Sequence, residues 1–249
     1  MIPLNDPLTI LHLYPREMNL YGDHGNVLAL RRRCEWRNIP VRVVPLETGS
    51  PFPDRVDLIF GGGGQDSGQE RVEKDLALRG ETIRALIEDG CPALLICGLY
   101  QLFGEGFVTE SGESIRGIGL FPAKTLAGKR RLVGNITIQT KRFGSVTGFE
   151  NHSGRTFLAG AAPFGRVLGG NGNNGKDGTE GILYKNAIGT YLHGPLLPQN
   201  PRVADFLLLA ALKRRDPSIR SLSPLDDSLE DAARANAASR PQHKKAQFL

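Results

Sequence analysis

The clearest structural signal in the sequence is the stretch Ala93–Gly104, ALLICGLYQLFG. Its first four residues are apolar and predict a short buried strand, while Tyr100–Phe103 predicts a helix. Cys97 and Gly98 lie between them, and a cysteine on a sharp turn between strand and helix is typical of a nucleophile elbow. Such a turn points the thiol out of the sheet and places it at a helix N-terminus, which stabilises the thiolate. The alternative is a buried structural cysteine, which is common for a free thiol.

The other two cysteines lack this context. Cys91 lies between Gly90 and Pro92 at a helix-to-strand turn, so we interpret it as structural. Cys34 stands among charged residues and is interpreted as a surface or half-buried residue of a helix. An odd number of cysteines without a secretory signal argues against a disulfide framework.

Segments on both sides of the elbow predict an α/β fold with a parallel sheet covered by helices. Shorter glycine-interrupted strands in the second half predict antiparallel additions to that sheet. We expect a main domain over residues 1–215 and a C-terminal segment, 216–249, that carries one helix and a frayed end. The predicted strands are Leu8–Tyr14, Val41–Leu46, Val56–Phe60, Ala93–Ile96, Ile136–Gln139, Ser145–Glu150, Arg166–Leu168, Gly181–Tyr184 and Ala187–Tyr191, and the predicted helices are Gly25–Asn38, Arg71–Asp89, Pro201–Arg214 and Leu225–Arg240.

Composition excludes several classes of protein. The chain has 249 residues, a formal net charge of +5 and no arrangement typical of a nucleic-acid-binding module. No apolar run approaches the roughly 18 residues of a membrane span, and no signal peptide is present, so we expect a cytoplasmic protein without membrane insertion. Histidines and cysteines do not cluster at metal-ligand spacing, so we expect no metal in this chain.

A nucleophilic cysteine needs a base, and the chain has five histidines. His12 falls within the first strand and is interpreted as a core residue. His193 ends a predicted strand and is followed by Gly194 and Pro195, at the sheet edge where ligands bind. His152 has a similar position, so the pattern leaves both histidines open as the base.

Six ordered motifs resemble those of class I glutamine amidotransferases of the cobyric-acid-synthase-like group, and most closely the glutaminase subunits of lipid II isoglutaminyl synthases. The resemblance covers roughly residues 8–212. It implies a three-layer, flavodoxin-like α/β domain with a mostly parallel central sheet. The motifs are NLYGDHGNVLALRRRCEWRNIPV, DLIFGGGGQD, IEDGCPALLICGLYQLFG, GFENHSGRT, GNGNNGKDGTEGILYKN and IGTYLHGPLLP.

The resemblance also implies roles for individual residues. Cys97 matches the family's nucleophile, His193 its general base, and Arg131 the arginine that holds the substrate glutamine. Gly61–Gly64 follows a buried strand where these enzymes place the backbone of the oxyanion hole, and we expect Gly63 and Gly64 to contact substrate.

One departure concerns the group that orients the base. Many class I enzymes have glutamate two residues after the histidine, whereas His193 is followed by Gly194 and Pro195. The candidates are Glu150, with His152 in a supporting position, Asp23, a backbone carbonyl, or a carboxylate of a partner protein. We favour the partner, because it would keep the glutaminase idle until a synthetase docks.

The partner implied by the resemblance is a Mur-ligase-like synthetase in a heterodimer. It would use ATP and Mg²⁺, which we expect to be absent from this chain, to amidate the α-carboxylate of D-glutamate in the lipid II stem peptide. This chain would contact lipid II only through the partner, at the inner face of the membrane. The alternatives are a cobyrinate-type synthetase as acceptor, a cysteine peptidase or stress protein on a related sheet, and a non-catalytic binding subunit.

Overall fold

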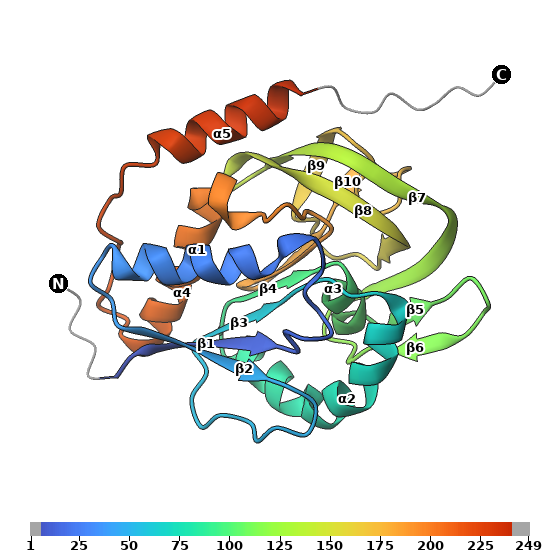
Figure 1. Cartoon of the computed structure of the whole chain (residues 1–249), viewed down its shortest axis with the longest axis horizontal. Helices are drawn as coiled ribbons and strands as arrows, with labels where there is room; N and C mark the ends of the chain where they lie inside the picture. Colours follow the sequence, from blue (N-terminus) through green and yellow to red (C-terminus); the bar gives the residue numbers. More distant parts are fainter. Residues whose placement is uncertain (1–5, 241–249) are drawn as a thin grey trace.

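A central six-stranded sheet carries the elbow, as the sequence predicted. The computed structural model describes residues 6–240, and its central sheet has the strand order β11-β12-β4-β3-β1-β2 (Figure 1). Every neighbouring pair is parallel except β11 and β12. The strands are β1 (Leu8–Leu13), β2 (Val41–Leu46), β3 (Leu58–Gly61), β4 (Ala93–Ile96), β11 (Ile182–Tyr184) and β12 (Ala187–Thr190).

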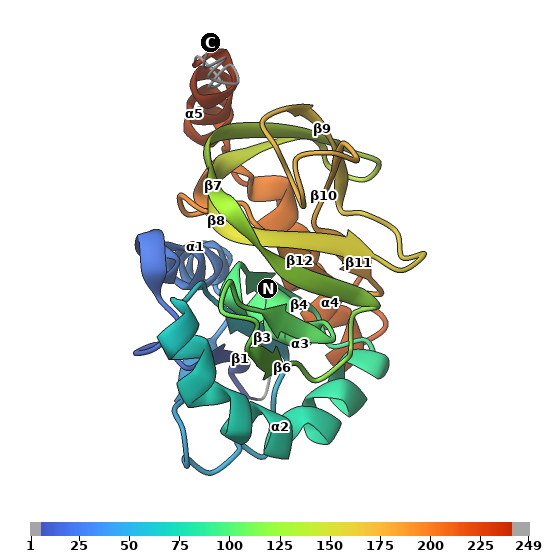
Figure 2. The ribbon, with the colours of Figure 1, turned by 90° about the vertical axis from the view of Figure 1, so that its right-hand side faces the viewer.

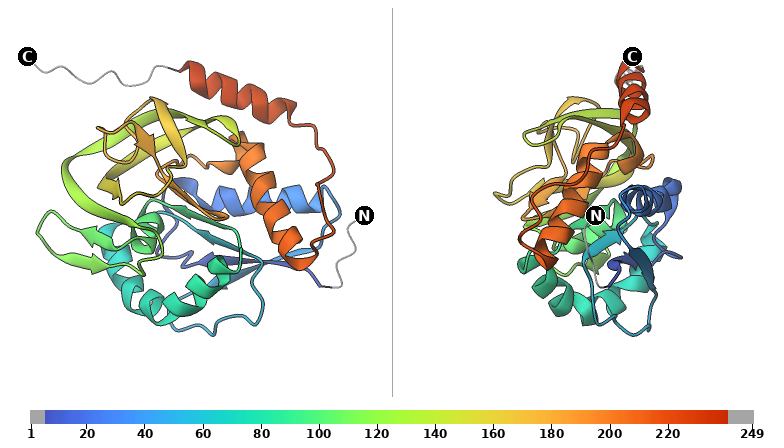
Figure 3. Two further views of the ribbon diagram at one scale, coloured as in Figure 1. Left: turned by 180° about the vertical axis from the view of Figure 1, so that it is seen from behind. Right: turned by 90° about the vertical axis from the view of Figure 1, so that its left-hand side faces the viewer.

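Helices cover both faces of this sheet, which gives the three expected layers. Helices α1 (His24–Glu35) and α4 (Pro201–Arg215) pack together on one face, and α2 (Asp66–Glu88) and α3 (Gly98–Phe103) on the other (Figures 1 and 3). All residues of β1, β3 and β4 are buried, because a parallel sheet with helices on both faces has no solvent-facing side. The prediction of a mixed α/β fold is confirmed.

The second half of the chain differs from the expectation in detail. Only β11 is an antiparallel addition to the central sheet, and β12 joins it in parallel. The six remaining described strands form a separate, mainly antiparallel sheet that lies against the first (Figure 2). These strands are β5 (Gly106–Val108), β6 (Ser114–Arg116), β7 (Ala123–Thr140), β8 (Gly144–Leu158), β9 (Gly165–Gly169) and β10 (Thr179–Glu180).

A long hairpin, β7–β8, dominates this second sheet. The sequence predicted only its inner ends, as Ile136–Gln139 and Ser145–Glu150. The register shifts between Ala127 and Leu132, so residues 128–131 form a bulge in β7. Glycine and charged residues around the bulge interrupt the apolar alternation from which a strand is recognised, but pairing with β8 continues on both sides of it.

The C-terminal segment docks on the main body through buried charges. Its helix, α5 (Ser228–Ser239), has no buried residue, yet Arg33 of α1 donates to both Asp205 of α4 and Asp227, the residue before α5. Residues 241–249 of the predicted tail lie outside the described residues. Within residues 6–240, no helix has both the length and the apolar character needed to cross a bilayer.

Two single-turn 3-10 helices flank the site described below. They are η1 (Leu20–Gly22), which precedes α1, and η2 (Leu197–Gln199), which precedes α4. Helix α2 begins at Asp66, five residues before the predicted start, so its first turn lies close to the Gly61–Gly64 loop. This earlier start places additional polar side chains at the edge of the sheet.

Candidate active site

Cys97 occupies a strained turn between β4 and α3. Its φ of 51° and ψ of −103° are unusual for a residue with a side chain, and such strain concentrates at functional sites. A Cβ on the following residue, Gly98, would lie 2.7 Å from Met18 Cε and 3.0 Å from the backbone nitrogen of Gly64. The turn therefore requires glycine at 98, and the predicted elbow is present in the structure.

The other cysteines are both buried structural thiols. Burial raises the pKa of Cys34 and of Cys91 to about 12, which keeps both thiols protonated and unreactive at neutral pH. The interpretation of Cys91 holds, whereas Cys34 is fully buried rather than on the surface. Cys34 lies on the side of α1 that packs into the core. The charged residues next to it in the sequence led to the prediction of an exposed position.

His193 is held rigidly at the end of β12. Its backbone exchanges two hydrogen bonds with Phe149 of β8, and its ring nitrogen Nδ1 lies 3.1 Å from Asp23 Oδ1. Both side chains are fully buried. Burial opposes the charged imidazolium, but the hydrogen bond to Asp23 and the nearby Cys97 outweigh burial and raise the pKa of His193 to about 10.

The side chains of Cys97, His193 and Asp23 all lie close to Gly63. A Cβ at this position would lie 2.8 Å from His193 Cε1, 3.2 Å from Cys97 Cβ and 3.3 Å from Asp23 Oδ2. The second ring nitrogen of His193, Nε2, is buried and has no nitrogen or oxygen partner among the described residues. Asp23 thus fixes one side of the imidazole and leaves the other for the thiol.

The structure gives the orienting position to Asp23 rather than to Glu150. The Glu150 carboxylate accepts hydrogen bonds from the backbone and side chain of Asn171 and from the backbone of Gly172. It is buried within the second sheet, where its nearest ionisable neighbour is His152, at 3.9 Å. The sequence made Asp23 one of several candidates for the group that orients His193. The one local signal for it was its place in YGDHG, just before α1.

The contacts of His152 differ from those of His193, because its ring packs against Tyr191 and hydrogen-bonds to the backbone rather than to a carboxylate. Its Nδ1 lies 2.8 Å from the carbonyl oxygen of Gly154, and its ring stacks on Tyr191 with centroids 3.6 Å apart. Burial lowers the pKa of His152, and its Nε2 has no hydrogen-bond partner among residues 6–240. The ring borders the pocket, but the structure brings His193, not His152, to Asp23.

The two glycines expected to contact substrate have different surroundings. The Gly63 N–H donates to Asp23 Oδ2 at 2.7 Å, so it is already engaged. Gly64 lines the pocket beside Cys97, and its nitrogen faces the first turn of α3. Gly63 thus holds Asp23 and Gly64 borders the pocket, while contact of either glycine with substrate stays a prediction.

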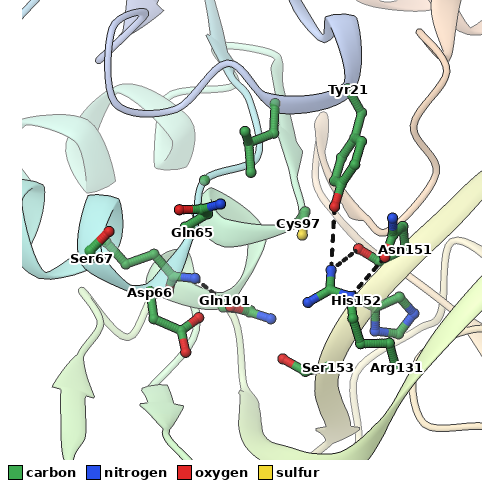
Figure 4. Close-up of a pocket in the computed structure, with 13 residues that line it drawn as sticks. Tyr21, Gln65, Asp66, Ser67, Cys97, Gln101, Arg131, Asn151, His152 and Ser153 are labelled. Atoms are coloured by element: carbon green, nitrogen blue, oxygen red, sulfur yellow. Dashed lines mark hydrogen bonds between the residues drawn. The ribbon is translucent and has the colours of Figure 1, made fainter.

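A polar pocket opens directly on Cys97 (Figure 4). Its volume is about 380 Å³. Arg131 enters it from the β7 bulge and donates through Nε and Nη2 to the side-chain and backbone oxygens of Asn151, while Nη2 lies 3.5 Å from Tyr21 Oη. The lining residues are Leu20, Tyr21, Gly64, Gln65, Asp66, Ser67, Gln69, Cys97, Gln101, Arg131, Asn151, His152 and Ser153.

Several of these residues were not singled out from the sequence. Tyr21 has a left-handed backbone with φ of 55°, and its ring makes an edge contact with His193 at a centroid distance of 4.9 Å. Asp66 and Asn151 belong to separate elements and have no local pattern that links them to Cys97. Among residues 6–240, no group of three or more His, Cys, Asp and Glu side chains is placed to bind a metal ion.

Comparison with known proteins agrees with this geometry. The CobB/CobQ-like glutamine amidotransferase domain family matches residues 9–201. Lipid II isoglutaminyl synthase (glutamine-hydrolyzing) subunit GatD from Staphylococcus aureus (strain N315) is 44% identical over 209 residues, which cover 84% of this chain and 86% of that protein. The subunit of the same name from Streptococcus pneumoniae (strain ATCC BAA-255 / R6) is 41% identical over 84% of this chain and 82% of its own.

Solved structures support the same fold at lower similarity. A structure described as a glutamine amidotransferase superposes with a TM-score of 0.57 at 14% identity and covers 81% of this chain and 98% of its own. The family match and the two relatives at 44% and 41% identity confirm the resemblance inferred from the six sequence motifs. The chain belongs to the CobB/CobQ-like glutamine amidotransferase family of enzymes.

Proposed function

We propose that this chain hydrolyses L-glutamine at Cys97 and passes the ammonia to a separate ATP-dependent synthetase. The observation that carries the proposal is the Asp23–His193–Cys97 arrangement at the end of a pocket that also contains Arg131. A thiol, a buried base and a carboxylate that orients the base form the constellation of acyl-transfer enzymes.

The chemistry follows from this arrangement. The thiol of Cys97 passes its proton to His193, because Asp23 stabilises the imidazolium that forms, and the thiolate attacks the side-chain amide carbon. The developing oxyanion accepts hydrogen bonds from the backbone of Gly64 and from the N–H that follows Cys97. His193 then donates a proton to the departing nitrogen, and ammonia leaves. Water activated by His193 hydrolyses the thioester and releases glutamate.

Arg131 would hold the other end of the substrate. Asn151 takes two hydrogen bonds from its guanidinium and fixes the plane of the group, while Nη1 has no partner among the described residues. A guanidinium held in this way suits a carboxylate, which it can bind through parallel N–H groups. We assign it to the α-carboxylate of glutamine.

The acceptor of the ammonia is suggested by the relatives. Those at 44% and 41% identity are named as subunits of lipid II isoglutaminyl synthase. We therefore propose a Mur-ligase-like partner that holds ATP and Mg²⁺ and amidates the α-carboxylate of D-glutamate in the lipid II stem peptide, at the cytoplasmic face of the membrane. Ammonia has to reach that acceptor before it is protonated, which requires a closed path between the subunits.

The position of Asp23 indicates whether glutaminase activity needs a carboxylate from the partner subunit. A carboxylate from the partner is not needed to hold Nδ1 of His193, because Asp23 occupies that place within the chain. We accordingly expect measurable glutaminase activity from the isolated chain, and expect the partner to act on it by other means than supplying this carboxylate.

Ammonia release from glutamine tests the proposal, with the chain alone and together with the synthetase. Cys97→Ser should abolish release in both preparations, and a glutamine-analogue electrophile should label Cys97 rather than Cys34 or Cys91. Labelling of either buried cysteine would contradict the mechanism. Absence of ammonia from both preparations would favour a non-catalytic subunit, and amidation of a cobyrinate-type acceptor in place of lipid II would contradict the proposed partner.

A further inference from the structure

The pocket beside Cys97 contains one fixed cation and one fixed anion. Of its thirteen lining residues, Arg131 and Asp66 alone carry a full charge, since burial keeps His152 neutral (Figure 4). Arg131 comes from the β7 bulge and Asp66 from the first turn of α2, and Figure 4 shows them on opposite sides of the space below Cys97. The two charges therefore reach the pocket from different elements, a helix that covers the central sheet and a strand of the second sheet.

The Asp66 carboxylate is available to a ligand. No described residue forms a hydrogen bond or an ion pair with it, although Arg131 at the other side is held by Asn151. An acidic residue in the first turn of a helix is also favoured by the helix dipole, which offers a purely structural explanation. That explanation accounts for an acid at this position but not for its place on the wall of a pocket that opens on the thiol.

We propose that Asp66 binds the α-ammonium group of the substrate and makes the pocket selective for a free amino acid. This inference rests on the proposed glutaminase function. At neutral pH a free amino acid carries a carboxylate and an ammonium group on one carbon, while its side-chain amide is uncharged. Arg131 and Asp66 match this pair of charges, and the amide then extends towards Cys97. A glutamine residue within a peptide lacks both charges and is excluded.

The selectivity also explains why both charges are needed. A pocket with Arg131 alone would accept any carboxylate that carries a terminal amide, and such a substrate would waste ammonia. Asp66 is exposed on the pocket wall, so an analogue that lacks the ammonium group binds less well because it forgoes a charge-assisted contact. Asp66 is thus a specificity-determining residue rather than part of the acyl-transfer chemistry.

The test compares L-glutamine with 4-carbamoylbutanoate, which is glutamine without its α-amino group. Asp66→Asn should raise KM for glutamine roughly 10- to 100-fold, as expected for the loss of a charge-assisted contact, and leave KM for 4-carbamoylbutanoate within about 3-fold. Glu70→Gln is the matched control, because Glu70 is an exposed acid one turn further along α2 that does not line the pocket. It should leave both values unchanged.

Calorimetric binding to the full-length Cys97→Ser chain gives the same comparison without turnover. A preference for glutamine over 4-carbamoylbutanoate that disappears with Asp66→Asn supports the inference. Equal weakening of both ligands indicates a structural role for Asp66 and overturns it, as does an unchanged preference. If glutamine binds with this preference but the native chain releases no ammonia even with its synthetase, the proposed glutaminase function fails while the assignment of Asp66 stands.

Discussion

Asp23 Oδ1 lies 3.1 Å from His193 Nδ1, although 170 positions separate the two residues in the chain. The same carboxylate accepts the N–H of Gly63 through its other oxygen, so the acid links the imidazole to the glycine loop. Each of the two oxygens has one donor, and the group has little freedom to rotate. His193 is therefore oriented from the residue that precedes α1, rather than from its own strand.

Asp23→Asn tests this link through activity. Asparagine keeps the shape of the side chain but does not stabilise an imidazolium, so we expect kcat for glutamine hydrolysis to fall by roughly 10²- to 10⁴-fold. KM should change little, because Asp23 does not line the pocket. An unchanged kcat in an ammonia-release assay would show that another group orients His193.

The pH dependence of stability tests the same link independently. The pKa of His193 is raised from 6.5 to about 10, so the interaction stabilises the native state fully below pH 6.5 and is lost as pH rises through about 10. The difference in free energy of unfolding between the native chain and Asp23→Asn should be largest near pH 6 and should shrink towards pH 10. Denaturant titrations at several pH values measure it, and a difference that grows with pH would contradict the assignment.

Gly63→Ala tests the closeness of the catalytic side chains. The added methyl would lie 2.8 Å from His193 Cε1 and would displace the ring from Cys97, so we expect kcat to fall at least about 100-fold with the fold intact. Gly80→Ala is the control, because its methyl would also meet a side chain closely, at 3.1 Å from Ile118 Cγ2, but away from the pocket. If the fold is intact, it should retain activity. Circular dichroism and ammonia release together distinguish a local displacement from unfolding.

Arg131→Ala tests the carboxylate site. We expect KM for glutamine to rise roughly 10- to 100-fold with a smaller change in kcat, because the contact is made in the ground state as well as in the transition state. Arg130→Ala provides the control, since Arg130 is its exposed neighbour on the same bulge and does not line the pocket. If Arg131→Ala and Arg130→Ala raised KM equally, Arg131 would act only as one of several surface cations and the assignment would be wrong.

Arg33→Ala tests how the C-terminal segment is held. The Arg33 side chain is only 4% exposed and pairs with Asp205 and Asp227. Its removal leaves Asp227 without a cation among the described residues and leaves Asp205 with Arg37 alone. We expect a loss of about 3 kcal/mol in the free energy of unfolding, and faster proteolysis within residues 216–240. Arg31→Ala, which removes an exposed pair with Glu35, is the control and should leave the free energy of unfolding nearly unchanged.

Much of the site could be predicted because its signals are local. The apolar strand, Cys97 and Gly98 are neighbours in the chain, and their order alone specifies a strained turn. Gly64 and His193 follow buried strands of the central sheet, which places both at the same edge as Cys97. The parallel sheet itself was predictable from strands β1, β3 and β4, since burial on both faces leaves uninterrupted apolar runs.

The rest depended on contacts that no local pattern records. The choice between His152 and His193 depends on which ring meets Asp23, and on the stacking of His152 against Tyr191. The length of β7 and β8 is set by pairing across the bulge, and that bulge carries Arg131 into the pocket. Asp66 reaches the same pocket because α2 starts five residues earlier than its apolar periodicity indicates.

The α/β fold, the elbow at Cys97 and the sheet edge that carries the candidate site could be read from the sequence, because they follow from residues adjacent along the chain. The tertiary structure decided which carboxylate orients His193, which glycine N–H remains free, and which charges face one another across the pocket. These relations join residues far apart in sequence, and they are fixed by strand register, helix packing and the burial of polar groups that need partners.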